Sequence, residues 1–296
     1  MAALQPQVAW LPPDQRLHLS HGPTDLIIKA EGNDAQRAYQ QAITAMDNLL
    51  EDIVKELPDL RLPASAETRF HHPVAKRMQH ASLGYGNQFI TPMAAVAGAI
   101  ADYVLDAMVR DRDLTKASVN NGGDIAFWLA NGEKATAVLA DMNEARIHID
   151  SSHPWRGMAT SGYGGRSLSL GIADAVMVIA DEASTADAAA TMIANAVHLP
   201  AHHYEADRIK TAPALSLDSA SDLGHRQVTT HVGALSPSAI TQALDSGEIA
   251  AQAVLAQKPI AGAVIRVKDH IRIVGFEHDS DIIMVKEESK LWSISQ

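Results

Sequence analysis

The sequence predicts an α+β fold, in which mixed and antiparallel sheets with hairpins are flanked by helices. Strand-like runs and helical periodicities interleave along the 296 residues, and many strands are joined by short turns rather than by helices. A doubly wound parallel sheet would need a longer crossover at each connection. No low-complexity linker or repeat divides the chain. We therefore expect a single domain over residues 1–296, with two intertwined subdomains as the alternative.

The elements follow from local patterns. Apolar residues recur at helical spacing from 35 to 57, with Asn33 or Asp34 as N-cap and Pro58 as the end. A second helix begins at Thr91-Pro92, and small residues dominate its first turns, so that a backbone or a ligand can approach closely. Tight packing of that helix on a sheet is the simpler alternative. Two further helices are expected over residues 185–197 and 236–257, the last with a break at Gly247.

Strands are expected wherever short apolar runs lie between turn signals. Asn131-Gly132 indicates a hairpin that leads into the strand 135–140. Residues 159–166 and 202–230 are expected to be loops. The predicted strands are 17–19, 26–30, 117–119, 125–129, 135–140, 147–149, 173–180, 263–267, 271–274 and 282–285.

Composition and charge exclude several classes of function. The formal net charge of −11 argues against nucleic acid and anionic membranes as partners, because both need clustered cations. Without cysteine the chain forms no disulfide, thiolate metal site, iron–sulfur cluster or cysteine nucleophile. The start has no basic segment before an apolar run, and the apolar stretch Pro92–Val109 carries Asp102 and Asp106, so we expect a cytoplasmic protein.

Asp187 and Thr191 are the candidate metal ligands. Their i, i+4 spacing puts a carboxylate and a hydroxyl on one helical face, where they offer two oxygen ligands to a hard cation such as Mg²⁺. The simpler alternative is an acidic residue that favours the helix dipole, followed by a threonine whose hydroxyl bonds a carbonyl.

Two glycine-containing segments are candidate ligand-binding loops. In Asn120-Asn121-Gly122-Gly123-Asp124 the glycines allow close approach of a ligand, while Asn120 and Asp124 supply polar contacts; a plain tight turn is the alternative. In the second segment Thr160, Ser161 and Gly162 offer hydroxyls and N–H groups to an anion, and Arg166 adds a planar fork. Tyr163 is one of few rings on which a ligand could stack, and a loop without function is the alternative.

A basic cluster and a histidine pair complete the candidates. His71-His72, Lys76 and Arg77 gather positive charge in an acidic chain, which suggests recognition of phosphate or carboxylate; a solvated turn is the alternative. His202-His203 imitates a metal site but lacks the helical His spacing that such sites use.

Taken together, these segments resemble the ApbE superfamily, which contains FAD:protein FMN transferases. The resemblance rests on Asn-x-Gly-Gly-Asp-Ile from Asn120, Thr-Ser-Gly from Thr160 and Ala-Asp-Ala-x-x-Thr from Ala186, in that order. The chain is most similar to an uncharacterised, cytosolic branch, through residues 21–26, 72–78, 89–101, 167–174 and 221–224. The similarity runs from about residue 21 to 274 and implies an ApbE-like fold.

The resemblance also implies a site. In the transferases Mg²⁺ lies near the FAD pyrophosphate, so Asp187 and Thr191 would hold Mg²⁺ with a backbone carbonyl near Val96. Gly122, Gly123 and the segment from Thr160 to Gly162 would border FAD or FMN. Two departures stand out: Ala97-Gly98 replaces the Lys-Gly of the transferases, and residues 166–170 replace their His-Ile-x-Asp-Pro.

The sequence is compatible with three functions. The first is an Mg²⁺-dependent transferase or hydrolase at the phosphates of FAD or a similar nucleotide, with Arg77 or Arg166 on phosphate oxygens and a protein as acceptor. The second is a flavin or nucleotide carrier without turnover. The third is an enzyme for another phosphorylated or acidic metabolite on the same scaffold. The hairpins and the small-residue helix suggest a homodimer.

Overall fold

The computed structural model describes residues 6–138, 145–165, 167–276, 282–284 and 293–294. Its helices are α1 (Ala35–Ala45), α2 (Leu49–Leu60), α3 (Pro73–Ser82), α4 (Val96–Val109), α5 (Ala183–Ala196), α6 (Ala214–Leu217) and α7 (Pro237–Leu255), with 3₁₀ turns η1 (Pro92–Ala95) and η2 (Ala206–Arg208). Its strands are β1 (Gln7–Leu11), β2 (Arg16–His21), β3 (Thr24–Glu31), β4 (Lys116–Asn121), β5 (Asp124–Leu129), β6 (Lys134–Val138), β7 (Ala145–Asp150), β8 (Gly157–Ser161), β9 (Ala175–Ala180), β10 (Ile209–Pro213), β11 (Gln227–Val232), β12 (Ile260–Val267), β13 (His270–Gly275), β14 (Ile282–Met284) and β15 (Ser293–Ile294).

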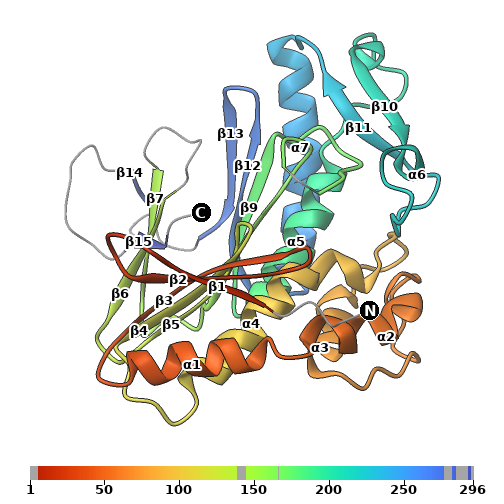
Figure 1. Ribbon diagram of the computed structural model, residues 1–296. Helices are drawn as coiled ribbons and strands as arrows, with labels where there is room; N and C mark the ends of the chain where they lie inside the picture. The colour runs from red at the N-terminus through yellow and green to blue at the C-terminus, as the bar shows by residue number, and fades with distance from the viewer. Residues whose placement is uncertain (1–5, 139–144, 166, 277–281, 285–292, 295–296) are drawn as a thin grey trace.

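A nine-stranded antiparallel sheet forms the centre of the molecule, with the order β1-β2-β3-β4-β5-β8-β9-β12-β13 (Figure 1). Helices α1, α4, α5 and α7 pack on one face, and the four-stranded sheet β14-β7-β6-β15 lies against the other. Within the smaller sheet β15 runs parallel to β6, while the remaining pairs are antiparallel. The predicted α+β class, with mixed and antiparallel sheets and flanking helices, is confirmed.

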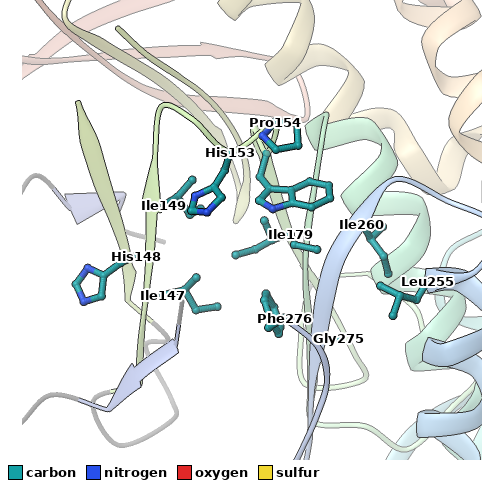
Figure 2. A pocket seen from close by; sticks show the side chains of 12 residues that line it. Ile147, His148, Ile149, His153, Pro154, Ile179, Leu255, Ile260, Gly275 and Phe276 are labelled. Carbon is teal, nitrogen blue, oxygen red and sulfur yellow. The ribbon is translucent and has the colours of Figure 1, made fainter. Parts of the chain in front are cut away.

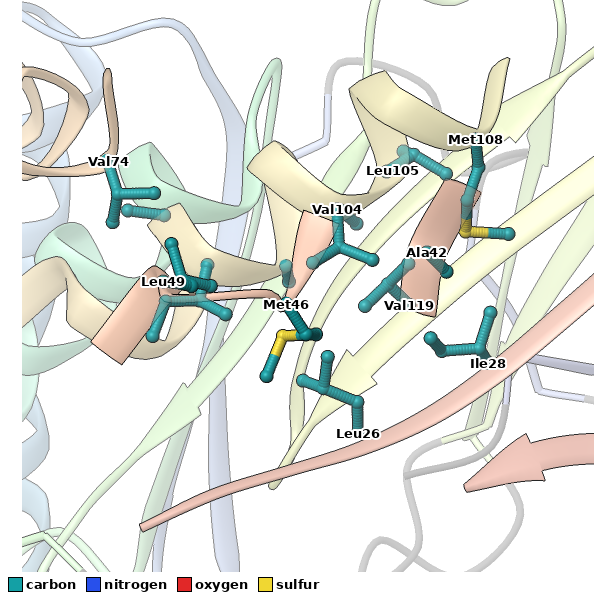
Figure 3. Close-up of a cluster of buried hydrophobic side chains, with 14 of the residues drawn as sticks. Leu26, Ile28, Ala42, Met46, Leu49, Val74, Val104, Leu105, Met108 and Val119 are labelled. Atoms are coloured by element: carbon teal, nitrogen blue, oxygen red, sulfur yellow. The ribbon is translucent and has the colours of Figure 1, made fainter. Parts of the chain in front are cut away.

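Strand β9 shows why the sequence produces this layering. Its near-continuous apolar run is buried on both faces, so alternate side chains serve different cores. Val176 and Val178 face the core under α5 and α7, whereas Met177 and Ile179 face the core against the four-stranded sheet. A third core lies between α1, α2 and α4 and strands β2 to β4, where Leu26, Ile28 and Val119 meet helical side chains (Figure 3).

The predicted helix over 35–57 is two helices. Asn48 adopts a left-handed conformation with φ of 57° and separates α1 from α2. Asparagine tolerates this conformation better than most residues, and the break lets Met46 and Leu49 both reach the core. The helix also does not end at Pro58 as predicted. It continues to Leu60, which is buried.

The predicted Asn131-Gly132 hairpin is also corrected. The turn exists, but β5 pairs with β4 and β8, so both of its edges are occupied. Strand β6 pairs with β7 instead, and the turn carries the chain from the large sheet to the small one. Residues 139–140 of the predicted strand lie outside the described residues, as does residue 285 at the chain's last predicted strand.

Three other segments differ from expectation. Thr160 and Ser161 belong to strand β8, and the turn begins only at Gly162. The stretch 202–230 contains the hairpin β10–β11 and short helix α6, whose many exposed side chains give a weak hydrophobic pattern (Figure 1). Helix α7 continues through Gly247, where a Cβ would lie 2.6 Å from Cγ2 of Val197.

Candidate functional site

Two adjoining cavities lie where α2, the start of α4, the β4–β5 turn, the end of β8 and α5 meet. The larger has a volume of about 550 Å³ and aliphatic side chains from α2 and α4, and we name it the apolar compartment. The smaller, of about 320 Å³, contains several aspartates, and we name it the acidic compartment. The residues that line both compartments are Arg61, Met93, Val96, Ala97, Asp124 and Ser167.

The structure brings most of the predicted site residues to these walls. They come from three parts of the chain that the sequence separates widely, namely the β4–β5 turn, the end of β8 and helix α5. The predicted residues found here are Gly122, Gly123, Asp124, Thr160, Ser161, Gly162, Asp187 and Thr191. The structure therefore supports treating these segments as one candidate site.

Asn120, Arg77 and Tyr163 are not part of the walls. Asn120 Oδ1 accepts a hydrogen bond of 2.8 Å from the Gly123 N–H and so shapes the β4–β5 turn. Tyr163 packs against the core under α5 and α7, and its hydroxyl lies 3.5 Å from Nζ of Lys268. Arg166 lies outside the described residues.

Many wall residues were missed from the sequence, and Asn121 and Arg61 are two polar examples. Asn121 is buried, and its amide donates to the Ala97 carbonyl at 3.1 Å, which joins β4 to the start of α4. Successive strand residues face opposite sides, so the same alternation that turns Asn120 away could have identified Asn121. Arg61 is the C-cap residue of α2 and is exposed to both compartments. No local motif marks it.

The β4–β5 turn depends on its glycines. Gly122 and Gly123 have φ of 69° and 115°, backbone conformations that residues other than glycine rarely adopt. Among the described residues beyond its chain neighbours, no heavy atom lies within 4 Å of the Cβ that a residue at 123 would carry, so there is open space beside the turn. Asp124 follows directly, and its Oδ1 accepts from the Thr160 N–H at 3.4 Å. This bond holds β5 beside β8 at the wall.

Asp187 lies in the acidic compartment close to Asp124. Burial raises the pKa of the Asp187 carboxyl well above its ordinary value, and the charge of Asp124 raises it further, against hydrogen bonds from Gly98 and Ala97. The Gly98 N–H donates to Asp187 Oδ2 at 3.0 Å. Asp187 therefore bonds the first turn of α4, not its own helix, which differs from the dipole alternative considered above.

Thr191 stands one turn further along α5. Its hydroxyl donates to Oγ of Ser161 on β8 at 3.4 Å, which links a wall residue of the acidic compartment to one of the apolar compartment. Further along the same face, Asn195 Oδ1 accepts from the Leu170 N–H at 2.9 Å and fixes the segment after Ser167. The polar face of α5 is thus turned toward the cavity.

Helices α4 and α5 cross in close contact beside the cavity. A Cβ at Gly98 would lie 2.3 Å from the Ala183 carbonyl oxygen, so only glycine permits this approach. Asp102, one turn after Gly98, is buried and accepts from the N–H groups of Ala183 and Ser184, both at 2.9 Å. Of the small residues expected to allow close approach, Gly98 packs against α5, whereas Ala97 lines both compartments.

Arg77 is held by acidic residues away from the cavity. Its guanidinium donates to Asp106 at 2.9 Å and lies 3.5 Å from Glu182. Burial lowers its pKa, but the charges of Asp102, Glu182 and Asp106 outweigh that effect and leave the pKa raised. The structure therefore places Arg77 outside the cavity walls, with partners from α4 and from the residue before α5.

The donor set in the acidic compartment fits Mg²⁺ in kind. Asp124, Asp187 and Thr191 supply carboxylate and hydroxyl oxygens, the hard ligands that this ion prefers, and Mg²⁺ commonly completes its shell with water and phosphate. Over the described residues no cluster of three or more His, Cys, Asp or Glu side chains is found. At the predicted histidine pair, Nδ1 of His203 instead accepts from the Glu205 N–H at 3.1 Å.

A separate cavity of about 450 Å³ lies between the four-stranded sheet and strands β9 and β12. Figure 2 shows Ile147 and Ile179 near Phe276 and His153 beside Ile149, while His148 lies on the other side of its strand from Ile147. It contains none of the residues predicted from the motifs.

One helix among the described residues, Pro92–Val109, is long and apolar enough to cross a membrane by length and composition alone. More than half of it, 56%, is buried inside the protein. It packs on β4, β5, α1 and α5, and its Asp102 is buried in the contact with α5.

The fold and the cavity define an α+β protein with an oxygen-rich site between a helix crossing and two strand ends. The family model described as AbpE bacteria matches residues 8–273, and the chain belongs to this family. The resemblance to the ApbE superfamily is thereby confirmed.

Archaeal relatives extend the comparison. A UPF0280 protein of Methanothrix thermoacetophila is 39% identical over 129 residues, 42% of this chain and 52% of that protein. One from Methanosphaerula palustris is 32% identical over 188 residues, 62% of this chain and 77% of that protein. The chain spans about half the length of the first of these. The apo flavinyl transferase ApbE of Pseudomonas stutzeri is 13% identical, with 93% and 97% of the two chains covered and a TM-score of 0.42.

Proposed function

We propose that the protein binds FAD or a similar nucleotide with Mg²⁺ and cleaves its pyrophosphate, so that from FAD the FMN moiety passes to an acceptor protein or to water and AMP is released. The observation that carries the proposal is the meeting of Asp124 and Asp187 in one cavity beside Thr191. Burial is the main cause of the raised Asp187 pKa, and the nearby charge of Asp124 adds to it, because two carboxylates close together disfavour each other's charge. A divalent cation would relieve that repulsion.

In this proposal the chain's own groups position the ligand. Asp187, Thr191 and Asp124 would hold Mg²⁺, which when bound neutralises negative charge on the pyrophosphate. The third metal ligand would be a backbone carbonyl near Val96. The neighbouring Ala97 carbonyl already accepts a hydrogen bond from the Asn121 amide. Gly122 and Gly123 leave room for close approach of the ligand to the backbone.

The apolar compartment suits the ring system of such a ligand. Its walls carry aliphatic side chains on one face of α2 and on the start of α4, so they would contact a flavin or adenine ring by dispersion and burial of apolar area. The aliphatic wall residues are Leu50, Ile53, Val54, Leu57, Met93, Val96 and Ile100. The compartment continues directly into the acidic one through their shared walls.

A carrier without turnover is the second candidate. It is favoured by Ala97, which stands where the resembling transferases have lysine. A flavin or nucleotide would then bind in the same cavity and leave unchanged. A protein acceptor for FMN and a cytoplasmic location belong to the transferase proposal.

The test combines ligand identification with turnover. Purified wild type is incubated with FAD and Mg²⁺, or with FAD and EDTA, and FMN and AMP are measured; native mass spectrometry records bound metal and nucleotide. Asp187→Asn keeps the side-chain shape, and Asp52→Ala removes an exposed carboxylate on α2 outside the cavity.

We expect divalent-dependent release of FMN or AMP by wild type and Asp52→Ala, and loss of bound metal in Asp187→Asn. Bound FAD that stays intact would favour the carrier. If wild type binds no flavin or nucleotide, both candidate functions fail.

A further inference from the structure

Arg61 occupies the boundary between the two compartments. It follows the last turn of α2 and lines both the apolar and the acidic walls. Within the part of the chain that the structure describes, its guanidinium forms no hydrogen bond or ion pair. An exposed arginine can be accommodated at a helix C-terminus by the helix dipole alone. The charges around Arg61 suggest a role in ligand binding as well.

The charged wall residues other than Arg61 are aspartates. Asp124, Asp187, Asp218 and Asp222 line the acidic compartment, and Asp222 shares a hydrogen bond with the hydroxyl of Thr91. Among the described residues of both compartments, Arg61 is the sole lysine or arginine. An anionic ligand that enters this field needs a positive group, because four carboxylates repel it.

Other cations near the site are already engaged. Arg77 is paired with Asp106 and Glu182, and Nζ of Lys258 bonds the Ala81 carbonyl at 3.2 Å. Nζ of Lys268 bonds the Val232 carbonyl at 3.0 Å. A guanidinium also suits a phosphate better than an ammonium does, since its planar fork donates two parallel hydrogen bonds.

We propose that Arg61 binds a phosphate group of the ligand at the boundary of the two compartments, with the ring portion in the apolar compartment. The inference rests on the proposed function for the placement of a nucleotide in this cavity. It adds a phosphate-binding residue that the motifs do not contain. It also orders the ligand: the ring lies on the α2 side, and the phosphates point toward Asp124 and Asp187.

The experiment compares ligands that differ only in phosphate. Affinities of FMN and riboflavin, and of ADP and adenosine, are measured by calorimetry with Mg²⁺ for wild type, Arg61→Gln, Arg61→Lys and Lys55→Gln. Lys55 lies on the same helix, is 73% exposed and pairs with Asp52, so its substitution removes a charge without touching the cavity. Thermal unfolding checks that each variant is folded.

We expect Arg61→Gln to weaken binding of FMN or ADP at least tenfold, about 1.4 kcal/mol, and to leave riboflavin and adenosine unchanged. Arg61→Lys should recover part of the loss, and Lys55→Gln should match wild type. Equal loss for ligands with and without phosphate would overturn the proposal, as would no loss in Arg61→Gln.

The flavin assignment is judged separately by the same data. If ADP binds and depends on Arg61 while FMN does not bind, the role of Arg61 stands and the flavin proposal fails. If FMN binds with no dependence on Arg61, the flavin proposal stands and the inference fails. If neither phosphate compound binds wild type, both fail.

Discussion

Asp102 on α4 and Asp187 on α5 make reciprocal contacts where the two helices cross: each carboxylate accepts hydrogen bonds from backbone N–H groups in the first turn of the other helix. Asp102 accepts from Ala183 and Ser184 at the start of α5, and Asp187 accepts from Gly98 in the first turn of α4. Each carboxylate thus satisfies N–H groups that a helix start leaves without partners. The exchange fixes the position of Asp187 at the cavity, so packing and candidate chemistry share the same residues.

Substitution of Gly98 by alanine tests this crossing. Alanine normally stabilises a helix by about 1 kcal/mol relative to glycine. Here the added Cβ would lie 2.3 Å from the Ala183 carbonyl oxygen, so we expect Gly98→Ala to lower the free energy of unfolding by about 1–3 kcal/mol. Urea unfolding measures the change in the free energy of unfolding, and Ala107→Gly on the same helix serves as the control. A more stable Gly98→Ala would contradict the close crossing.

Asp102 should make stability depend on pH. Burial raises its pKa to about 6, although hydrogen bonds from Ser184 and Ala183 and the charge of Arg77 oppose the shift; Glu182 adds to it. In the unfolded chain the carboxyl loses its proton near pH 4, so between about pH 4 and 6 the folded state binds more protons. The free energy of unfolding therefore falls as pH rises through this range and is level above it.

The comparison with Asp102→Asn isolates this contribution. Relative to the variant, wild type should lose about 3 kcal/mol between pH 4 and pH 7, from two pKa units at about 1.4 kcal/mol each. Urea unfolding at a series of pH values measures the difference. A constant difference across that range would show that the carboxyl titrates normally in the folded protein.

Arg77→Met tests whether Arg77 is structural. Its removal leaves Asp102 buried without the nearby positive charge, and Asp106 and Glu182 without their partner. We expect the free energy of unfolding to fall by about 1–3 kcal/mol while the affinity for FMN stays unchanged. Chemical unfolding and calorimetry measure the two effects. A selective loss of FMN binding in a fully stable variant would restore the original assignment of Arg77 to phosphate.

Asn121→Asp should disturb the start of α4. Asn121 is buried, and its amide donates to the Ala97 carbonyl. An aspartate has no donor when ionised and would place its charge against that carbonyl oxygen, which should cost about 2–4 kcal/mol. Asn87→Asp, at an exposed position, serves as the control for the added charge. Equal stability of the two variants would show that the Asn121 bond contributes nothing.

Sequence patterns predicted most of the elements because their periodicities reflect burial on one or two faces. The predictions were wrong where a tertiary partner decided the outcome. The Asn131-Gly132 turn is an ordinary hairpin signal, yet β5 already had two neighbours, which no local pattern reveals. The break at Asn48 is similar, since the apolar spacing continues across it while the chain turns to bury both Met46 and Leu49.

Only those site residues that lie in short sequence motifs could be predicted. The glycines and hydroxyls of the site lie in short motifs, and the structure brings those motifs together. Arg77 could not be placed from the sequence, because its guanidinium pairs with Glu182, more than a hundred residues away along the chain. Arg166 lies outside the described residues. Arg61 carries no motif and reaches the cavity only because α2 folds against the start of α4.

The cavity walls extend along the chain from Pro23 to Leu223. Such a site has high contact order, since loops must close over most of the molecule before its walls meet. Ligand affinity is therefore a reporter of complete folding: during refolding it should return with the last native phase, after helical signals have recovered. Any fragment that contains all of the walls must span at least residues 23–223, so the site exists only as a property of the assembled fold.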